Sequence, residues 1–181
     1  MTEPNAGWST TPSPPPTRAA GVTISLLPGQ VVSLAGGVLV MVGAWLDWVR
    51  PDRDFGPPFG LSAYDVPARF LFRDSGFAVN RGGPTIGWLV AIVGVVCIVA
   101  ALTRVIAMLA LPAGVAALAL AVWYALRLRN LVDNFGGFGP SFGDALGLGV
   151  IVVGLGGIVA AIGGILSLAA RPPSAVRTDG R

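Results

Sequence analysis

The feature that most constrains this chain is a run of 42 residues, from Thr85 to Leu126, that contains a single charged side chain, Arg104. As one straight helix, the run would be about 63 Å long, twice the hydrocarbon thickness of a bilayer. The chain must therefore fold back on itself, and we expect the turn at Thr103 and Arg104, which places the guanidinium among the lipid headgroups. Pro112 then falls about two turns into the next helix and is expected to bend it.

The composition also favours a bilayer over water as the solvent. Of the 181 residues, 54% are hydrophobic and 12% are charged, so the charged share is about half that of a soluble domain. A soluble particle of this composition would expose large apolar patches. The sequence therefore predicts an all-α membrane protein with four transmembrane helices in a bundle. The predicted spans are 31–49, 85–102, 105–126 and 145–170, within a transmembrane domain of residues 29–170.

Both ends of the chain are polar. Residues 1–28 are rich in Pro, Ser and Thr and carry too few apolar side chains to offset the entropy of ordering, so they are predicted to be a disordered tail. This tail lacks the charged start and the small-residue cleavage site of a signal peptide, and we expect the first span to stay in the membrane. At the other end, Arg171 and two prolines end the last helix, and residues 171–181 form a polar tail.

Two segments that precede the second and fourth spans are similar to each other. Phe55–Asp65 and Phe135–Asp144 each contain two Phe-Gly pairs, then a serine, and an aspartate three residues after that serine. The spans that follow also match after a shift of sixty positions, for example at Val93-Gly94 and Val153-Gly154. We therefore predict two parallel helix-loop-helix repeats, with both Phe-Gly loops on one face of the membrane. The alternative explanation is a shared bias toward Gly and Val.

The arginines give no single answer for the orientation of the spans. Seven of the twelve lie in the two loops, which under the positive-inside rule favours external tails. The net charge gives the opposite preference, because the two loops also contain six aspartates. An unstructured leader without a signal is most simply left untranslocated. We therefore expect a multi-pass protein of the cell membrane with both termini in the cytoplasm.

Small residues recur along the predicted spans at intervals that suit helix packing. In lipid, helices associate mainly where small side chains let their backbones approach closely. Span one has Ser33 and Gly37, and span three repeats alanine every four residues from 113 to 125. Span four has small residues on more than one side, so it is expected either to be central or to face another chain. The packing residues predicted there are Gly147, Gly154, Gly156, Gly157, Gly163 and Gly164.

Charged and aromatic residues mark the ends of spans one and four. Asp47 lies between Trp45 and Trp48, and Arg50 follows on what would be the same helix face. Asp144 would open the fourth span, where the helix dipole favours a carboxylate. A carboxylate deep in a membrane is by default a candidate for a proton or cation pathway, but tryptophans are typical of the membrane interface. We therefore predict that these five residues lie at the interface.

The first loop contains a candidate helix, Asp65–Arg73. Asp65 is a suitable N-cap, Pro67 lies in the first turn, and Val66 and Phe70 are four residues apart. The segment is predicted to be a short amphipathic helix at the membrane interface. It would either contact lipid or a partner, or form a lid over the end of the bundle.

Several function classes are excluded by what the sequence lacks. It has no histidine, which removes bis-histidine haem, histidine zinc sites and the commonest general base. The single cysteine, Cys97, falls in the middle of a span and is expected to be a buried, inert thiol. The sequence has no phosphate-binding loop or nucleophile elbow, and its arginines form no basic stripe. No cofactor, metal ion or nucleic-acid partner is therefore expected.

The Trp-Leu-Asp-Trp end of span one, the glycine-aromatic loops and the use of arginine for all twelve basic residues resemble a group of small bacterial proteins. These are the four-span membrane proteins of unknown function from high-GC actinobacteria such as mycobacteria. The resemblance covers residues 31–170 and implies no catalytic residue.

The predicted role is non-enzymatic: an accessory or scaffold component of the cell membrane. Its expected partners are membrane lipids and either other membrane proteins or further copies of itself. The alternative is a small transporter or channel-like protein for a hydrophobic or lipid cargo, because the spans lack the charged side chains that an ion path needs. A membrane enzyme would have to depend on Asp47, Asp65, Asp144 and the loop arginines.

Overall fold

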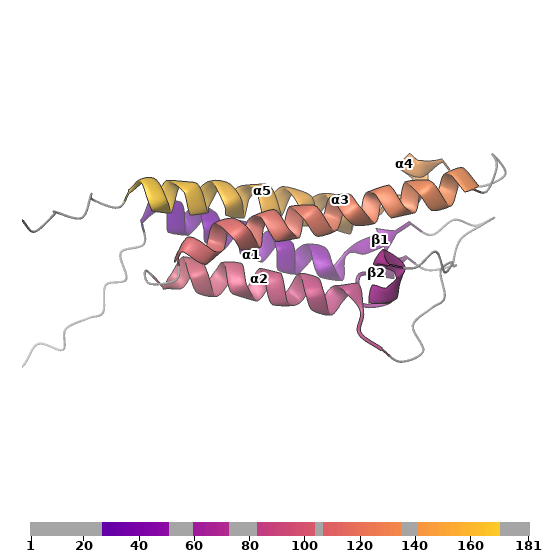
Figure 1. The fold of residues 1–181 in the computed structure, drawn as a ribbon, viewed down its shortest axis with the longest axis horizontal. Coiled ribbons are helices and arrows are strands. Elements are labelled where there is room, and N and C mark those ends of the chain that lie inside the picture. Colours follow the sequence, from indigo (N-terminus) through magenta and orange to yellow (C-terminus); the bar gives the residue numbers. More distant parts are fainter. Residues whose placement is uncertain (1–26, 51–59, 73–82, 104–106, 135–140, 171–181) are drawn as a thin grey trace, which may run out of the picture.

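The computed structural model describes residues 27–50, 60–72, 83–103, 107–134 and 141–170 (Figure 1). In this part of the chain, the long helices are α1 (Pro28–Trp45), α2 (Ile86–Leu102), α3 (Ala110–Asn134) and α5 (Leu148–Ala169). The shorter elements are the strands β1 (Asp47–Val49) and β2 (Leu61–Ser62), the 3-10 helices η1 (Ala68–Leu71) and η2 (Ala107–Leu109), and the one-turn helix α4 (Phe142–Ala145).

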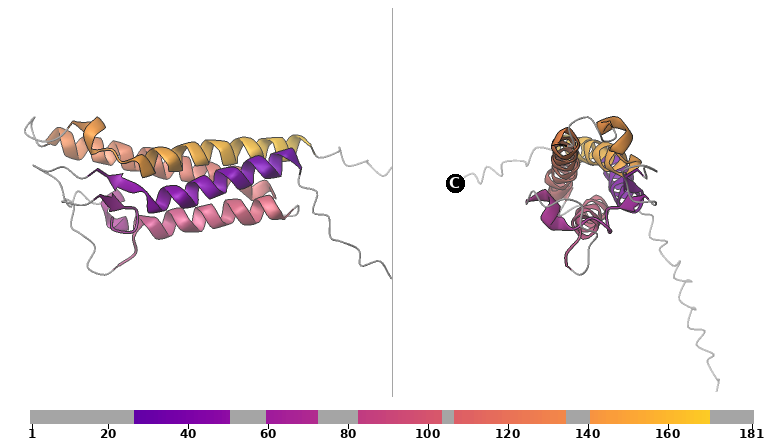
Figure 2. Two further views of the ribbon diagram at one scale, coloured as in Figure 1. Left: turned by 180° about the vertical axis from the view of Figure 1, so that it is seen from behind. Right: turned by 90° about the vertical axis from the view of Figure 1, so that its right-hand side faces the viewer.

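The four long helices form a ring in which neighbours run antiparallel (Figure 2). α5 lies between α1 and α3, and α2 completes the ring with a large contact to α1 and a smaller one to α3. The strands, η1 and α4 lie together at one end of the bundle, which we call the loop end (Figure 1). The first residue of α1 and the last residue of α5 lie at the opposite end.

The lengths and the outer faces of the helices suit a membrane. α1, α3 and α5 are long and apolar enough to cross one, and α2 is also apolar but has 17 residues. Their outward side chains are large and aliphatic, such as Ile92 on α2, Val122 on α3 and Ile162 on α5. The predicted all-α, membrane-type bundle is confirmed, and by the length and hydropathy of its helices the chain is a multi-pass membrane protein.

The core changes in character along the bundle. Toward the end opposite the loops, the buried side chains are small, for example Cys97, Ala113 and Ala160. At the loop end, large residues fill the space between the helices, and the two largest that are completely buried are Trp48 and Tyr124. At the loop end, aromatic packing therefore adds to the close backbone contacts between the helices.

The first helix is shorter at its C-terminal end than the predicted span 31–49. α1 ends at Trp45, and Asp47–Val49 is extended and pairs with β2. The indole N–H of Trp48 donates to the carbonyl oxygen of Gly43 at 2.9 Å and so satisfies a carbonyl of the last helical turn. An aromatic and a β-branched residue in sequence also suit a strand. The prediction of a helix over the whole apolar run 31–49 is therefore wrong for its last residues.

The third helix extends further than the predicted span 105–126. α3 reaches Asn134, and its last two turns are amphipathic: Leu128 is buried, while Arg129 and Asp133 form an exposed ion pair with 3.7 Å between Nε and Oδ2. Pro112 lies in the first turn of α3, where a missing N–H costs no helical hydrogen bond. The expectation that Pro112 lies two turns into a helix and bends it is therefore wrong.

The other two predicted spans differ little from the helices. The span 85–102 corresponds to α2 with Thr85 as its N-cap residue, and the span 145–170 corresponds to α5, which begins after Gly147. Leu27 is the N-cap residue of α1 and Pro28 begins it. Residues 1–26 of the predicted N-terminal tail, the C-terminal tail 171–181 and Arg104 lie outside the described residues. Phe55, Phe59, Phe135 and Phe138 of the Phe-Gly pairs also lie outside them.

Candidate functional site

The contact between α1 and α5 is lined by glycines at intervals of seven residues. They are Gly29, Gly36 and Gly43 on α1, and Gly149, Gly156 and Gly163 on α5. A Cβ added at Gly156 would lie 2.8 Å from the backbone nitrogen of Val40, so the two backbones are in direct contact. The Ser33 hydroxyl also donates to the carbonyl oxygen of Ala160 at 3.3 Å. Close backbone approach of this kind stabilises helix packing in lipid, because there the hydrophobic effect contributes little to contacts between apolar side chains.

A second glycine face of α5 meets α3. A Cβ at Gly157 would lie 2.7 Å from the carbonyl oxygen of Gly114, and one at Gly164 would lie 2.7 Å from the backbone nitrogen of Leu111. Gly154 is different, because a Cβ there would meet the side chain of Ala121 at an ordinary 3.7 Å. Both small-residue faces of α5 are thus covered by helices of the same chain, because α5 lies between α1 and α3.

The predicted packing residues therefore have different neighbours. Ser33, Gly156 and Gly163 lie between α1 and α5, whereas Gly157 and Gly164 lie between α3 and α5. Gly37 faces α2 instead, with the Cγ1 atom of Ile98 2.9 Å from an added Cβ. Four further glycines of this contact were not among the predicted packing residues, although their spacing of seven residues indicates one helix face: Gly29, Gly36, Gly43 and Gly149.

Gly147 has a role outside the helix to which it was assigned. It precedes α5, and a Cβ there would contact the carbonyl group of Asp47. Its N–H donates to the carbonyl oxygen of Trp48 at 3.0 Å, and the N–H of Arg50 donates to the carbonyl oxygen of Ala145 at 3.2 Å. Residues 145–147 thereby run antiparallel to β1 on the side opposite β2.

These contacts join the two loops. β1 lies between β2, which belongs to the first loop, and residues 145–147, which belong to the second. We call this unit, made of β1, β2, η1 and residues 142–147, the loop-end cap. It is the candidate functional site, because in the described part of the chain it holds polar groups of both loops in one arrangement outside the helices.

The repeated serine and aspartate of the two loops adopt similar arrangements. The Ser62 hydroxyl donates to Oδ2 of Asp65 at 2.7 Å, and the Ser141 hydroxyl donates to Oδ2 of Asp144 at 2.6 Å. The N–H of Ser62 also donates to Asp65, which leaves less of β2 free to pair with another strand. The sequence similarity between the loops is therefore matched by a shared local turn.

Aromatic side chains fasten the cap to the bundle. The rings of Trp48 and Tyr124 meet edge to face with their centroids 4.8 Å apart, and the ring of Phe70 lies 5.6 Å from that of Tyr124. The Tyr124 hydroxyl is buried and has no hydrogen-bond partner among the described residues. The indole N–H of Trp123 donates to the carbonyl oxygen of Leu71 at 2.9 Å and so ties η1 to α3.

The segment predicted as a helix over Asp65–Arg73 is shorter and of another type. η1 is a single 3-10 turn with Pro67 at its N-cap position, because the Asp65 carboxylate is bound to Ser62 and does not cap it. Val66, Phe70 and Leu71 are buried against the bundle. The burial of these side chains supports the second alternative, a lid over the bundle end. Arg73 lies outside the described residues.

The two tryptophans predicted at the interface lie in different places. Trp45 belongs to an outward aromatic surface, and Trp48 belongs to the bundle core. Trp45 is exposed, and Tyr64 lies between it and Trp88 with ring centroids 4.8 and 6.0 Å away. Such a group of rings is typical of the membrane interface. Trp48 is completely buried and belongs to the core rather than to that surface.

Of the three charged residues of that prediction, Asp47 and Asp144 belong to the cap, and Arg50 directly follows β1. Asp47 begins β1, so the expectation that Arg50 shares a helix face with it is wrong; the helix has already ended at Trp45. Asp144 lies in α4 and not in the first turn of α5. Asp47, Arg50 and Asp144 are all exposed.

The polar side chains at the cap include the exposed carboxylates Asp47, Asp65 and Asp144 and the hydroxyls of Ser62 and Ser141. Among the described residues, no three His, Cys, Asp or Glu side chains are grouped to hold a metal ion. Comparison of the chain with protein-family models, with curated proteins and with solved structures found no match.

Proposed function

We propose that this chain is a non-enzymatic accessory or scaffold component of the cell membrane and that its loop-end cap binds a partner membrane protein. The observation that supports the proposal is the position of β1 between β2 and residues 145–147. This pairing holds the inner ends of both loops in one fixed arrangement, which suits a surface that must be recognised. The glycines support the same role, because they pack the helices closely into one rigid bundle. Their faces are covered by helices of the same chain, which leaves the cap as the surface for a partner.

The proposed topology has four crossings, with both termini in the cytoplasm. α2 is about 25 Å long at 1.5 Å per residue, which is at the lower limit for a transmembrane helix. Its place in the ring beside α1 supports a crossing, because the two helices have similar extents (Figure 2). Reporter fusions in each loop, in the turn after α2 and at the C terminus test this. Fewer than four crossings would contradict the proposal.

We include in this proposal the resemblance to the four-span membrane proteins of actinobacteria. This resemblance implies no enzymatic activity. The runner-up is a transporter or channel-like protein for a hydrophobic or lipid cargo. The described helices place no Asp, Glu, Lys or Arg between Pro28 and Trp45, between Ile86 and Leu102, or between Leu148 and Ala169. An ion pathway is disfavoured by this lack of charge, but a lipid pathway is not.

Native purification with mass spectrometry separates the two candidates. A scaffold should co-purify with a larger protein at fixed stoichiometry, whereas a homo-oligomer with bound lipid would favour transport. Gly147→Ala places a methyl group against the carbonyl of Asp47 and should release the partner by separating β1 from residues 145–147. Gly154→Ala is the matched control, because Gly154 lies on α5 outside the cap and its Cβ would meet the Ala121 side chain at an ordinary 3.7 Å. Equal partner recovery with both variants, at equal abundance, would contradict binding through the cap.

A further inference from the structure

The 3-10 helix η1 presents one basic and one aromatic side chain on its outer side. In a 3-10 helix, side chains three residues apart eclipse each other. Arg69 and Phe72 have this spacing, and the N–H of Phe72 donates to the carbonyl oxygen of Arg69 at 3.0 Å. Both are exposed, while Phe70 and Leu71 between them are buried. The two exposed side chains therefore project together, away from the bundle core.

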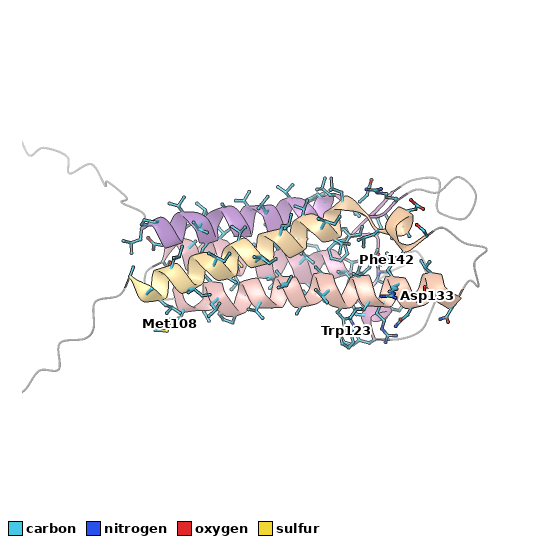
Figure 3. All side chains as sticks on the ribbon, turned by 90° about the horizontal axis from the view of Figure 1, so that it is seen from above. Met108, Trp123, Asp133 and Phe142 are labelled. Carbon is cyan, nitrogen blue, oxygen red and sulfur yellow. The ribbon has the colours of Figure 1, made fainter. Side chains whose placement is uncertain are left out.

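Trp123 on α3 lies beside this pair. Its indole N–H donates to the carbonyl oxygen of Leu71, the residue before Phe72, at 2.9 Å. Figure 3 shows Trp123 at the side of α3, next to η1. Phe72 is 75% exposed and Trp123 is 52% exposed, so two aromatic rings and one guanidinium share an outer surface.

The depth of this surface in the membrane follows from α3. The helix has no charged residue from Ala110 to Leu126, and its charges begin at Arg127. Trp123 is thus about one turn inside the point where the hydrocarbon ends. Because Trp123 is bound to Leu71, η1 lies close to this boundary, where the long Arg69 side chain can reach the lipid headgroups.

At that depth, the charge of Arg69 has one obvious counterpart. Among the described residues, its guanidinium has no ion-pair partner, in contrast to Arg129, which pairs with Asp133. Phospholipid phosphates are the anions that the bilayer itself places at this level, and basic residues there favour anionic lipids. Exposed aromatic rings would face water on a soluble protein, but here they can contact the upper part of the acyl chains.

We propose that Arg69, Phe72 and Trp123 form a binding site for an anionic phospholipid, with the phosphate on the Arg69 guanidinium and the acyl chains against the two rings. The site rests on the membrane location of the bundle and not on the scaffold role. It would hold the η1 lid, and with it the first loop, at a fixed depth against the membrane surface.

The test uses the full chain reconstituted in vesicles of phosphatidylglycerol and phosphatidylcholine in equal amounts. After extraction in mild detergent, the lipids that remain bound are quantified by mass spectrometry. The wild-type protein should retain phosphatidylglycerol preferentially, and Arg69→Gln should lower the ratio of the two bound lipids about five-fold. Arg129→Gln is the matched control and should leave the ratio unchanged, because Arg129 is paired and lies further along α3.

Four results would overturn the site. The first is an unchanged ratio for Arg69→Gln, and the second is an equal fall for both arginine variants. The third is displacement of the bound lipid by inorganic phosphate, which would indicate a simple anion site without acyl contacts. Dimers that depend on Arg69 but carry no lipid would also overturn it, since the surface would then contact a second copy. Size-exclusion profiles establish that each variant is folded; since Arg69 is exposed, the Arg69→Gln profile should match that of the wild type.

Discussion

The indole N–H of Trp48 donates a 2.9 Å hydrogen bond to the carbonyl oxygen of Gly43, and the whole Trp48 side chain is buried. The same indole lies against Tyr124 of α3, and a Cβ added at Gly149 of α5 would lie 2.5 Å from its Cδ1 atom. One side chain outside any helix thus contacts three of the four long helices and the cap. It follows that the packing of the bundle and the arrangement of the cap are coupled at this residue.

Trp48→Ala should lower the free energy of unfolding by about 3–5 kcal/mol, because it leaves a large cavity at the loop end. Trp45→Ala is the matched control: Trp45 is 70% exposed, and we expect a loss of less than about 1 kcal/mol. The measurement is unfolding in mixed micelles with increasing sodium dodecyl sulfate, followed by circular dichroism. Similar losses for the two variants would show that Trp48 is not a core residue.

Tyr124→Phe should leave the protein as stable as the wild type or more stable by about 1–2 kcal/mol. The hydroxyl is buried without a partner among the described residues, and an unsatisfied buried polar group carries a desolvation cost. The ring contacts with Trp48 and Phe70 are retained in phenylalanine. A clear loss of stability in the same micelle titration would mean that the hydroxyl binds a water molecule or a ligand.

Gly157→Ala should destabilise the bundle by about 1–3 kcal/mol, because the added methyl group would lie 2.7 Å from the carbonyl oxygen of Gly114. Gly154→Ala is one turn away on the same helix and meets only a side chain at 3.7 Å, so it should have little effect. Thermal unfolding in mild detergent compares the two directly. Equal melting temperatures would contradict the close contact between α3 and α5.

The close contact between α3 and α5 also determines the expected effect of larger substitutions on folding and assembly. Gly157→Leu and Gly164→Leu place bulk against α3 of the same chain, so they should unfold the protein rather than separate assembled copies. Loss of folded protein on size exclusion, with no accumulation of a smaller folded species, is the expected result. A stable, folded and smaller species would show instead that these glycines face another chain.

The sequence predicted the helices well where local pattern decides the structure. The break in the apolar run near Thr103 and the start of α2 after Thr85 follow from charge and length alone. The small residues of α5 were also recognisable, because lipid gives few other reasons for glycine at regular helical spacing. Which neighbour each glycine meets depends on the arrangement of the helices, and Gly37, which faces α2, shows that spacing alone does not settle it.

The cap was not predictable in the same way. Asp47–Val49 follows an apolar helix without a proline or glycine, and only pairing with β2 and with residues 145–147, far away in sequence, makes it a strand. Asp65 fits the N-cap preference, but its carboxylate binds Ser62, three residues earlier. Here non-local hydrogen bonds and a local turn outweighed helix propensity.

Asp47→Asn should change neither the abundance nor the stability of the protein by more than about 0.5 kcal/mol. The side chain is exposed and lies against Gly60, and the pairing of β1 with β2 uses the backbone of Asp47, which asparagine retains. Recovery of the partner in native purification should also be unchanged, since the substitution keeps the shape of the cap. Gly60→Ala provides the comparison, because its methyl group would contact the Asp47 carboxylate and move it. If Asp47→Asn abolished a growth or transport phenotype at normal abundance, the carboxylate itself would have a function. That result would contradict the interpretation that Asp47 has only a structural role at the membrane interface.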